Sequence, residues 1–215
     1  TTSEVANDNL RRAGVGDERI FFVGNTMIDT LLANMDRLRR PECVDELSLE
    51  PGEYFVTTLH RPANVDGGDS FARLLQAIAD GARDLLVVFP VHPRTQKTLE
   101  GLPWLPDNIQ LVDPQPYLEF NWLVKHARAV ITDSGGITEE TTVMGVPCIT
   151  LRDSTERPET VTVGTNELIG TNPENLKPAL DRLFAGQWKK GAIPDKWDGK
   201  TGERIVTELE RLLTE

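Results

Sequence analysis

Apolar runs and helix-spaced apolar positions alternate along most of the chain, and this pattern predicts alternating strands and helices. Short apolar runs, many of them rich in β-branched residues, predict strands at residues 54–59, 85–89, 109–112, 129–132, 148–151 and 167–169. A helix is predicted between the first two strands, where apolar residues recur at helical spacing: Phe71, Leu74, Leu75 and Ile78. Further helices are predicted from about residue 95 and at residues 116–126, 137–144, 174–184 and 203–213.

The repeated order of strand, helix and strand determines the fold class that we expect. Parallel strands of one sheet need long crossover connections, so this order predicts an α/β protein with helices on both faces of a parallel sheet. The run Leu85-Leu86-Val87-Val88-Phe89 contains no polar residue, as is typical of a strand buried on both faces. About six such strands match a Rossmann-like, doubly wound parallel sheet.

The segments outside the predicted sheet have weaker patterns. We predict a short helix around Asn9 and Leu10, a strand running into a turn at residues 20–25, and a helix at residues 27–40. Residues 39–53 are charged and contain two prolines, so they are interpreted as a surface connection, and residues 186–199 are predicted to be a loop. The chain is interpreted as one domain, with connecting elements at 1–50, the core sheet at 51–185 and a C-terminal helix at 200–215.

Composition and charge exclude some classes of protein. The chain has 215 residues, 39% of them hydrophobic, which fits one large domain with a substantial core. A net charge of −11 disfavours nucleic acid and anionic membrane as partners, so an anion site would have to be locally basic or built from backbone amides. No membrane-spanning run and no secretory leader is visible, and a cytoplasmic protein is expected. Cys43 and Cys148 lie far apart, so no disulfide is expected, and three histidines without a CxxC motif give no reason to expect a metal.

The unusual polar residues of the chain follow the predicted strands. Ligands of a doubly wound sheet bind beyond the carboxyl ends of its strands. The loops at that edge contain His60-Arg61, His92-Pro93-Arg94, Asp113-Pro114-Gln115, Ser134-Gly135-Gly136 and residues 152–157. We therefore expect a ligand site at this edge of the sheet.

The segment Ser134-Gly135-Gly136 joins a predicted strand to a predicted helix. Two glycines at such a turn let a ligand approach the backbone closely, and the first amides of the helix can donate to an anion. Glu140 lies one helical turn further on, where its carboxylate can accept both hydrogen bonds of a ribose diol. This combination indicates a nucleotide or a nucleotide sugar. The alternatives are a tight turn capped by Ser134, and a Glu139–Glu140 pair that faces solvent and matches the helix dipole.

The charged loop of residues 152–159 directly follows a predicted buried strand. The guanidinium of Arg157 in this loop can pair with phosphate oxygens, because its forked donors match their geometry. The alternative is an ion pair between Arg157 and Glu156 or Glu159.

Three more residues of these loops are candidates for the site. His60 can hydrogen-bond a phosphate or act as an acid or base, but it can also be a cap or a packed loop residue. Gln115 can read the edge of a base with its amide. Phe120 can pack against a base or ribose, although a core position explains this residue equally well.

Together these residues resemble the UDP-N-acetylglucosamine 2-epimerase family, of the non-hydrolysing kind. The resemblance extends in order and spacing through nearly the whole chain. Shorter matching stretches are GNTMID at 24–29, TLHR at 58–61, PVHP at 90–93, DPQPYL at 113–118 and GVP at 145–147. The most specific stretches are TDSGGITEE at 132–140 and LRDSTERPE at 151–159.

The resemblance implies a two-domain fold of the glycosyltransferase-B type, with the ligand in a cleft between two Rossmann-like halves. This chain would be the C-terminal half, which binds UDP. The resemblance implies that Ser134, Gly135 and Gly136 bind the diphosphate and that Glu140 binds the ribose. Arg157 and a catalytic His60 would also contact the diphosphate. Gln115 and Phe120 would form the pocket for the uridine.

The implied reaction interconverts UDP-GlcNAc and UDP-ManNAc during the synthesis of polysaccharide precursors. The proton on C2 is removed, UDP is eliminated, and UDP adds again after a proton reaches the other face. The carboxylates that move these protons would lie in an N-terminal domain that this chain lacks, so the chain alone is expected to be inactive. No cofactor is expected, and the intact enzyme is expected to be a homodimer.

Two other interpretations stay open at this stage. The chain can be the donor-binding domain of a UDP-sugar glycosyltransferase of the same two-domain type, or a non-catalytic module that binds a nucleotide sugar. Ala63 also departs from the family pattern, because many relatives have a carboxylate there, and this departure puts activation by a second substrate molecule in doubt.

Overall fold

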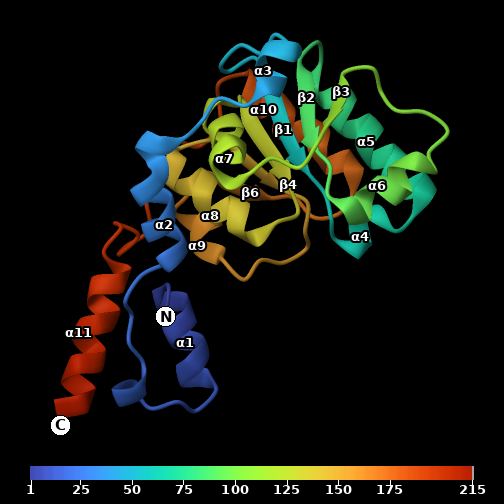
Figure 1. Ribbon diagram of the computed structural model, residues 1–215. Helices are drawn as coiled ribbons and strands as arrows, with labels where there is room; N and C mark the ends of the chain where they lie inside the picture. The colour runs from blue at the N-terminus through green and yellow to red at the C-terminus, as the bar shows by residue number, and fades with distance from the viewer. Residues whose placement is uncertain (215) are drawn as a thin grey trace.

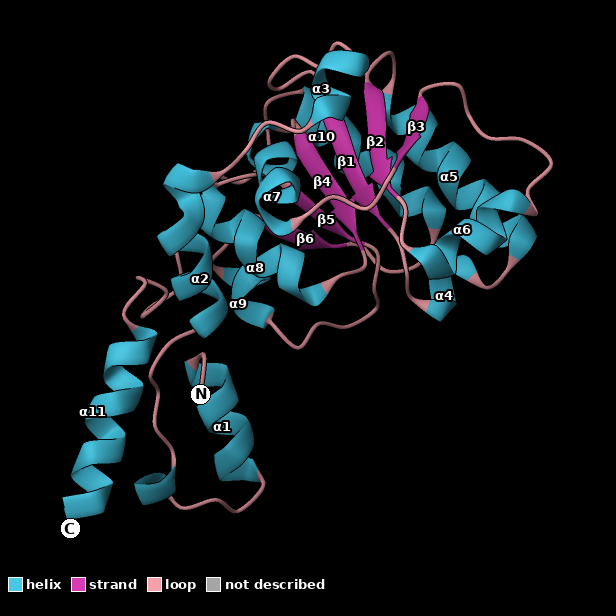
Figure 2. Cartoon of the chain, viewed as in Figure 1, coloured by secondary structure: helices cyan, strands magenta, loops and turns pink. Residues whose placement is uncertain are grey.

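The computed structural model describes residues 1–214, and its centre is a parallel sheet (Figure 2). The strand order is β3-β2-β1-β4-β5-β6, and each adjacent pair of strands is parallel. The strands are β1 (Tyr54–Thr58), β2 (Leu86–Pro90), β3 (Ile109–Val112), β4 (Ala129–Thr132), β5 (Cys148–Thr150) and β6 (Asn166–Leu168). The prediction of a doubly wound, parallel sheet of about six strands is confirmed.

Helices precede the sheet, connect its strands and follow it. They are α1 (Glu4–Arg12), α2 (Thr26–Asn34), α3 (Glu42–Glu46), α4 (Pro62–Val65), α5 (Gly68–Ala82), α6 (Pro93–Glu100), α7 (Tyr117–His126), α8 (Gly135–Met144), α9 (Pro158–Thr162), α10 (Leu176–Phe184) and α11 (Thr201–Thr214). Short 3₁₀ turns occupy Asp17–Arg19, Met35–Arg37 and Pro173–Asn175. Each predicted helix between strands is present, with ends that differ by a few residues.

Each face of the sheet packs against its own hydrophobic core. Alternate residues of one strand point to opposite faces, so β1 supplies both cores. Phe55 packs with apolar residues of α5 and α10, whereas Tyr54 and Val56 pack with those of α3 and α7. Cys43 and Cys148 are free, buried and part of the second core.

Helix α8 follows β4 after a connection of two residues and ends at Gly145. The φ of Gly145 is 72°, in the left-handed region that glycine adopts without steric cost. The predicted end of this helix is therefore confirmed, and the helix begins at Gly135 rather than at Ile137. Both glycines of the motif at 134–136 thus belong to the first turn of the helix.

Two predictions for the first 53 residues are wrong. Residues 20–25 form no strand; the amides of Val23 and Gly24 donate to the carbonyl of Thr1 instead, because no strand of the sheet lies beside this segment. Residues 39–53 are not only a surface connection, since they contain α3 and bury Val44 and Leu49 in the second core. The helix predicted at 27–40 ends as α2 at Asn34 and continues only as a 3₁₀ turn.

Helices α1 and α11 lie to one side of the sheet, with both termini of the described chain (Figure 1). The start of α11 is fixed by α2, because the carboxylate of Asp29 accepts the amides of Thr201 and Gly202 at 3.1 and 2.7 Å. Further along α11, Val206, Leu209 and Leu212 are about half exposed. Over residues 1–214, no helix is long and apolar enough to cross a membrane.

Candidate functional site

The order of the strands changes direction between β1 and β4. From β1 the chain proceeds outward to β2 and β3, then returns to β4 beside β1 and proceeds outward to β6. At such a point the two central loops diverge and leave a crevice at the carboxyl edge of the sheet. The loops that meet there begin at Leu59 and His60 after β1 and at Asp133 and Ser134 after β4.

Helix α8 starts with unpaired backbone amides at this crevice. Ser134 is the N-cap residue, but its side chain forms no capping hydrogen bond, and its amide donates to Thr132 Oγ1 at 3.0 Å. Within residues 1–214, the amides of Gly135 and Gly136 have no hydrogen-bond acceptor. Both amides, together with the positive end of the helix dipole, are available to an anion. The alternative of a turn capped by the Ser134 side chain is therefore wrong.

Gly135 and Gly136 also leave room for two neighbouring side chains. A Cβ atom on Gly135 would lie 2.5 Å from Oε1 of Glu156, and one on Gly136 would lie 3.0 Å from Cε of Met27. Glycine at these positions lets α2 and the loop of residues 152–157 approach the start of α8. Close packing therefore explains why both positions are glycine, in addition to the free amides that they present to the crevice.

A cavity of about 340 Å³ opens beside the start of α8. Its lining comes from the last residues of β1 and β2, from the loops after β1, β2, β3 and β4, and from α7 and α8: Thr58, Leu59, His60, Pro90, His92, Pro114, Gln115, Phe120, Ser134 and Ile137. The structure thus brings together four residues that the sequence predicts for the site, namely His60, Gln115, Phe120 and Ser134. Phe120 also packs at the edge of the second core, in agreement with the alternative interpretation, and its contact with a base or ribose stays a prediction.

Glu140 lies in α8 and is buried, with 6% of its surface exposed. Burial raises the pKa of its carboxyl, while hydrogen bonding to Tyr117 and Asn121 of α7 opposes the rise. Glu139 is also buried, at 1% exposed, so the alternative of a solvent-facing glutamate pair is wrong. Glu140 is a desolvated acceptor between α7 and α8, one turn from the free amides.

Arg157 pairs with a different glutamate from the two that the sequence analysis considered. Its Nε donates to Oε1 of Glu139, and 32% of the Arg157 side chain remains exposed. Burial raises the pKa of Glu139, against the opposing effect of the Arg157 charge. The Nη1 atom of Arg157 lies 3.4 Å from the carbonyl oxygen of Glu156. The guanidinium therefore joins α9 to α8, and the structure places it outside the lining of the cavity.

Asp133 is a buried acceptor at the site that the sequence analysis did not select. Its carboxylate accepts the amides of His60 and Arg61 at 3.1 and 2.9 Å and the Nδ2 of Asn64 at 3.0 Å. The Nδ1 of His60 lies 2.9 Å from Asp133 Oδ1. The side chain of Asp133 has 0% exposure, so this ion holds the loop after β1 against the end of β4. The sequence signal is an aspartate directly after a strand that begins with the apolar run Ala129-Val130-Ile131.

Two cations near the start of α8 were also missed as individual site residues. Arg61 donates from Nε to the carbonyl oxygen of Asp133 at 2.9 Å, and its Nη2 lies 3.9 Å from Oε1 of Glu156. Arg152 pairs with Oε2 of Glu156 at 2.7 Å, and this hydrogen bond lowers the pKa of Glu156. Their sequence signal is position, since Arg61 and Arg152 both follow strands of the sheet within three residues. The two guanidinium groups supply positive charge beside the free amides.

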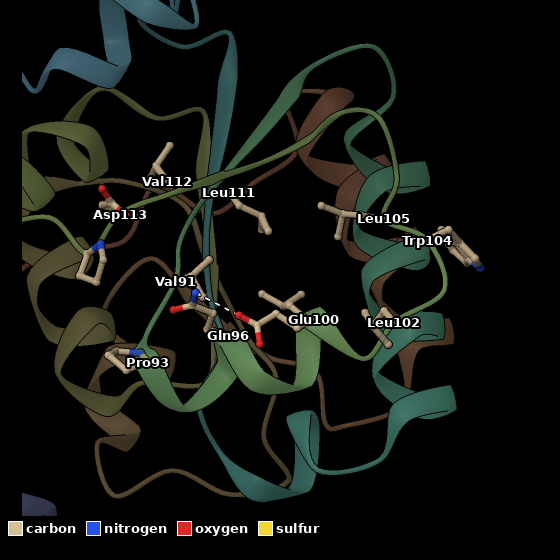
Figure 3. Close-up of a pocket in the computed structure, with 12 residues that line it drawn as sticks. Val91, Pro93, Gln96, Glu100, Leu102, Trp104, Leu105, Leu111, Val112 and Asp113 are labelled. Carbon is tan, nitrogen blue, oxygen red and sulfur yellow. Dashed lines mark hydrogen bonds between the residues drawn. The ribbon is translucent and has the colours of Figure 1, made fainter.

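A larger hollow of about 460 Å³ lies between α6, β3 and the connection that joins them (Figure 3). Figure 3 shows Leu102, Leu105 and Leu111 around it, and Gln96 donating to Glu100 across 3.2 Å. This hollow shares one lining residue, Pro114, with the cavity at α8. It contains none of the residues that the sequence predicts for the site. The cavity at α8 is therefore the candidate site.

Comparisons with known proteins show which family this chain resembles. Residues 1–210 match the sequence profile of UDP-N-acetylglucosamine 2-epimerase. The UDP-N-acetylglucosamine 2-epimerase of Methanocaldococcus jannaschii is 40% identical over 219 residues, which cover 96% of this chain and 59% of that protein. A crystal structure of the M. jannaschii UDP-GlcNAc 2-epimerase in complex with UDP-GlcNAc and UDP has a TM-score of 0.85 at 39% identity, over 98% of this chain and 60% of that one.

A second solved structure gives the same result at lower identity. The co-structure of S. aureus MnaA with UDP has a TM-score of 0.85 at 28% identity, over 100% of this chain and 59% of that one. The present chain thus spans about three fifths of the length of the proteins that it matches. Since the profile extends over residues 1–210, this chain belongs to the UDP-N-acetylglucosamine 2-epimerase family.

Proposed function

We propose that this chain is the UDP-binding part of an enzyme that interconverts UDP-GlcNAc and UDP-ManNAc. One observation carries the proposal more than any other. The amides of Gly135 and Gly136 begin a helix without an acceptor in the described chain, and they do so beside a cavity lined by His60, Gln115 and Phe120. A nucleoside diphosphate has the anion and the planar base that this pair of features would accept.

Each part of the ligand has a partner in this proposal. The diphosphate lies at Ser134, Gly135 and Gly136, where the helix dipole and the nearby guanidinium groups of Arg61 and Arg152 compensate the overall negative charge of the chain. The uracil lies in the cavity between Gln115 and Phe120, and the ribose diol donates to Glu140. A buried carboxylate gains more from such a pair of donors than an exposed one, because no water competes for its oxygens.

The chemistry proposed for this half is stabilisation of the leaving group. When the bond between the sugar and UDP breaks, negative charge develops on the departing phosphate oxygen. Preorganised amides and guanidinium groups stabilise that charge without reorganising at the moment of reaction. His60 lines the same cavity, where an N–H of its ring donates to a diphosphate oxygen. Holding UDP also keeps the unsaturated sugar intermediate beside it until UDP adds again.

The groups that remove and return the C2 proton are proposed to lie in a preceding domain of the intact enzyme. In the same proposal, α11 crosses back to that domain, since Val206, Leu209 and Leu212 form an apolar row on the helix that is about half exposed here. The intact enzyme is proposed to be a homodimer. A glycosyltransferase donor domain would use the same crevice, but no feature of this site favours that function over the epimerase one.

Calorimetric titration of the chain with UDP, uridine and inorganic pyrophosphate tests the proposal. We expect UDP to bind more tightly than either part alone, because base, ribose and diphosphate each have a partner. The Glu140→Gln variant should bind UDP at least about 10-fold more weakly, since hydrogen bonds to a charged acceptor contribute roughly 1.5–3 kcal/mol. The chain should not epimerise UDP-GlcNAc.

A matched control is Glu210→Gln on α11, which changes the same functional group at an exposed position remote from the cavity. Its affinity for UDP should equal that of the unmodified chain. No heat at millimolar UDP, or equal affinities of the Glu140 and Glu210 variants, would count against the proposed function.

A further inference from the structure

The two oxygens of the buried Asp133 carboxylate share the amide of His60 and otherwise have different partners. Oδ2 accepts the amides of Arg61 and His60 at 2.9 and 3.1 Å and the Nδ2 of Asn64 at 3.0 Å. Oδ1 accepts the same His60 amide at 3.2 Å and faces Nδ1 of the His60 ring at 2.9 Å. Both oxygens therefore help to fix the backbone that carries His60, and only Oδ1 contacts the ring.

The carboxylate is ionised at neutral pH. Burial alone would raise the pKa of Asp133, but hydrogen bonds from His60, Arg61 and Asn64 hold that pKa below its usual range. An ionised carboxylate has acceptors and no donor. The hydrogen between Oδ1 and Nδ1 therefore belongs to His60, and a neutral His60 ring has no hydrogen on Nε2.

The other ring nitrogen faces the candidate site. Nδ1 and Nε2 lie on opposite sides of an imidazole ring, so a ring whose Nδ1 contacts Asp133 directs Nε2 away from it. Asp133 has 0% side-chain exposure, whereas the His60 side chain is 45% exposed and lines the cavity of about 340 Å³. Nε2 is thus the nitrogen of His60 that a bound ligand can reach.

We infer that Asp133 is a positioning residue, which keeps one proton on Nδ1 of His60 so that proton exchange with a bound ligand occurs only at Nε2. The identity of that ligand, a nucleoside diphosphate, rests on the proposed function. Protonation at Nε2 gives an imidazolium whose Nδ1–H stays on Asp133 and whose Nε2–H donates to a phosphate oxygen. Loss of that proton returns Nε2 to an acceptor, and the proton on Nδ1 does not move. A buried carboxylate that orients a histidine in this way also fixes its tautomer.

The Asp133→Asn variant tests the inference, because it keeps the shape and exchanges one acceptor for a donor. The amide oxygen is expected to take the place of Oδ2, where three donors converge. The NH₂ group then faces Nδ1 of His60 and donates to it, so the ring must hold its proton on Nε2. The tautomer of His60 is read from ¹⁵N chemical shifts of its two ring nitrogens, with the nucleotide absent.

In the unmodified chain we expect Nδ1 protonated and Nε2 unprotonated at high pH, and we expect the reverse in Asp133→Asn. The spectrum of the unmodified chain is informative even if the variant does not fold. Thr95→Val is the matched control: it removes a buried hydrogen bond of 2.7 Å to the carbonyl of Leu59, beside the same loop, and should leave the tautomer unchanged. An unprotonated Nδ1 in the unmodified chain, or no exchange of tautomer in a folded Asp133→Asn variant, would overturn the inference.

UDP titrations separate this inference from the proposed function. At the high pH of the ring-nitrogen measurement, the His60 ring of the unmodified chain has no hydrogen on Nε2 to donate to phosphate. In Asp133→Asn the Nε2–H is present and donates to a phosphate oxygen, so at that pH the folded variant should bind UDP at least as tightly as the unmodified chain. Absence of UDP binding in both proteins contradicts the proposed function and leaves the ring-nitrogen result intact. Weaker binding of UDP by a folded Asp133→Asn variant at that pH contradicts the role assigned to Asp133.

Discussion

At the residue scale, the site is built around carboxylates that are buried for different reasons. Asp133 is surrounded by donors, and hydrogen bonds outweigh burial in setting its pKa. Glu140 is almost as buried, but burial outweighs its hydrogen bonds to Tyr117 and Asn121, so its pKa is raised. Such an incompletely paired carboxylate lowers the stability of the folded chain at neutral pH, and under the proposed function the ribose of the ligand would supply the missing donors.

This difference predicts how Glu140→Gln changes stability with pH. A carboxyl whose folded pKa is raised favours folding below its unfolded pKa of 4.5 and loses that contribution as pH rises through the folded value. The variant should therefore be more stable than the unmodified chain at pH 7, by about 1 kcal/mol. The difference should shrink as pH falls toward 4.5.

Urea unfolding at pH 7 and at pH 4.5 measures the two differences. Glu210→Gln, at an exposed position, should leave stability unchanged at both pH values. A Glu140→Gln variant that is less stable than the unmodified chain at pH 7 would show that the carboxylate is well paired in the free protein.

At the element scale, α8 connects the core of the molecule to the site. Its first turn presents the amides of Gly135 and Gly136 to the crevice, and its next turn buries Glu139 and Glu140. Its last turn ends at Gly145, after which the chain enters β5. A defined end fixes the register between α8 and β5, and so helps to fix where the first turn lies.

Gly145→Ala tests how much of this geometry depends on the end of the helix. A Cβ at residue 145 meets no atom within 4 Å, so any cost comes from the φ of 72° alone. We expect the free energy of unfolding to fall by about 1–2 kcal/mol, as for a non-glycine residue in the left-handed region.

Gly68→Ala is the matched control, because this glycine of α5 also has open space around it but does not have a positive φ. It should be neutral or stabilising by up to roughly 1 kcal/mol. Equal losses for the two variants in urea unfolding would contradict the conformational explanation.

At the scale of the whole molecule, the sequence predicts best those features that depend only on residues close together in the chain. Continuous apolar runs such as residues 85–89 identify strands because the strand itself is buried on both faces. The segment 20–25 has a similar run and forms no strand, since a strand also needs a neighbour that the local sequence does not specify.

The positions of His60, Gln115 and Ser134 at the cavity could be predicted because each residue follows a strand, and the sheet brings those strand ends together. The roles of Asp133 and the partner of Arg157 were not found, because His60 and Glu139 lie far from them in the sequence and meet them only in the fold.

The central claim is that the first amides of α8 receive the diphosphate of UDP. Backbone amide NMR of the ¹⁵N-labelled chain during a titration with UDP measures this directly, since each amide reports its own hydrogen bonding. We expect the Gly135 and Gly136 resonances to shift and saturate with the same dissociation constant, and inorganic pyrophosphate to shift these two while leaving Phe120 unchanged. Saturable shifts at other residues, with Gly135 and Gly136 unmoved at millimolar UDP, would contradict the account.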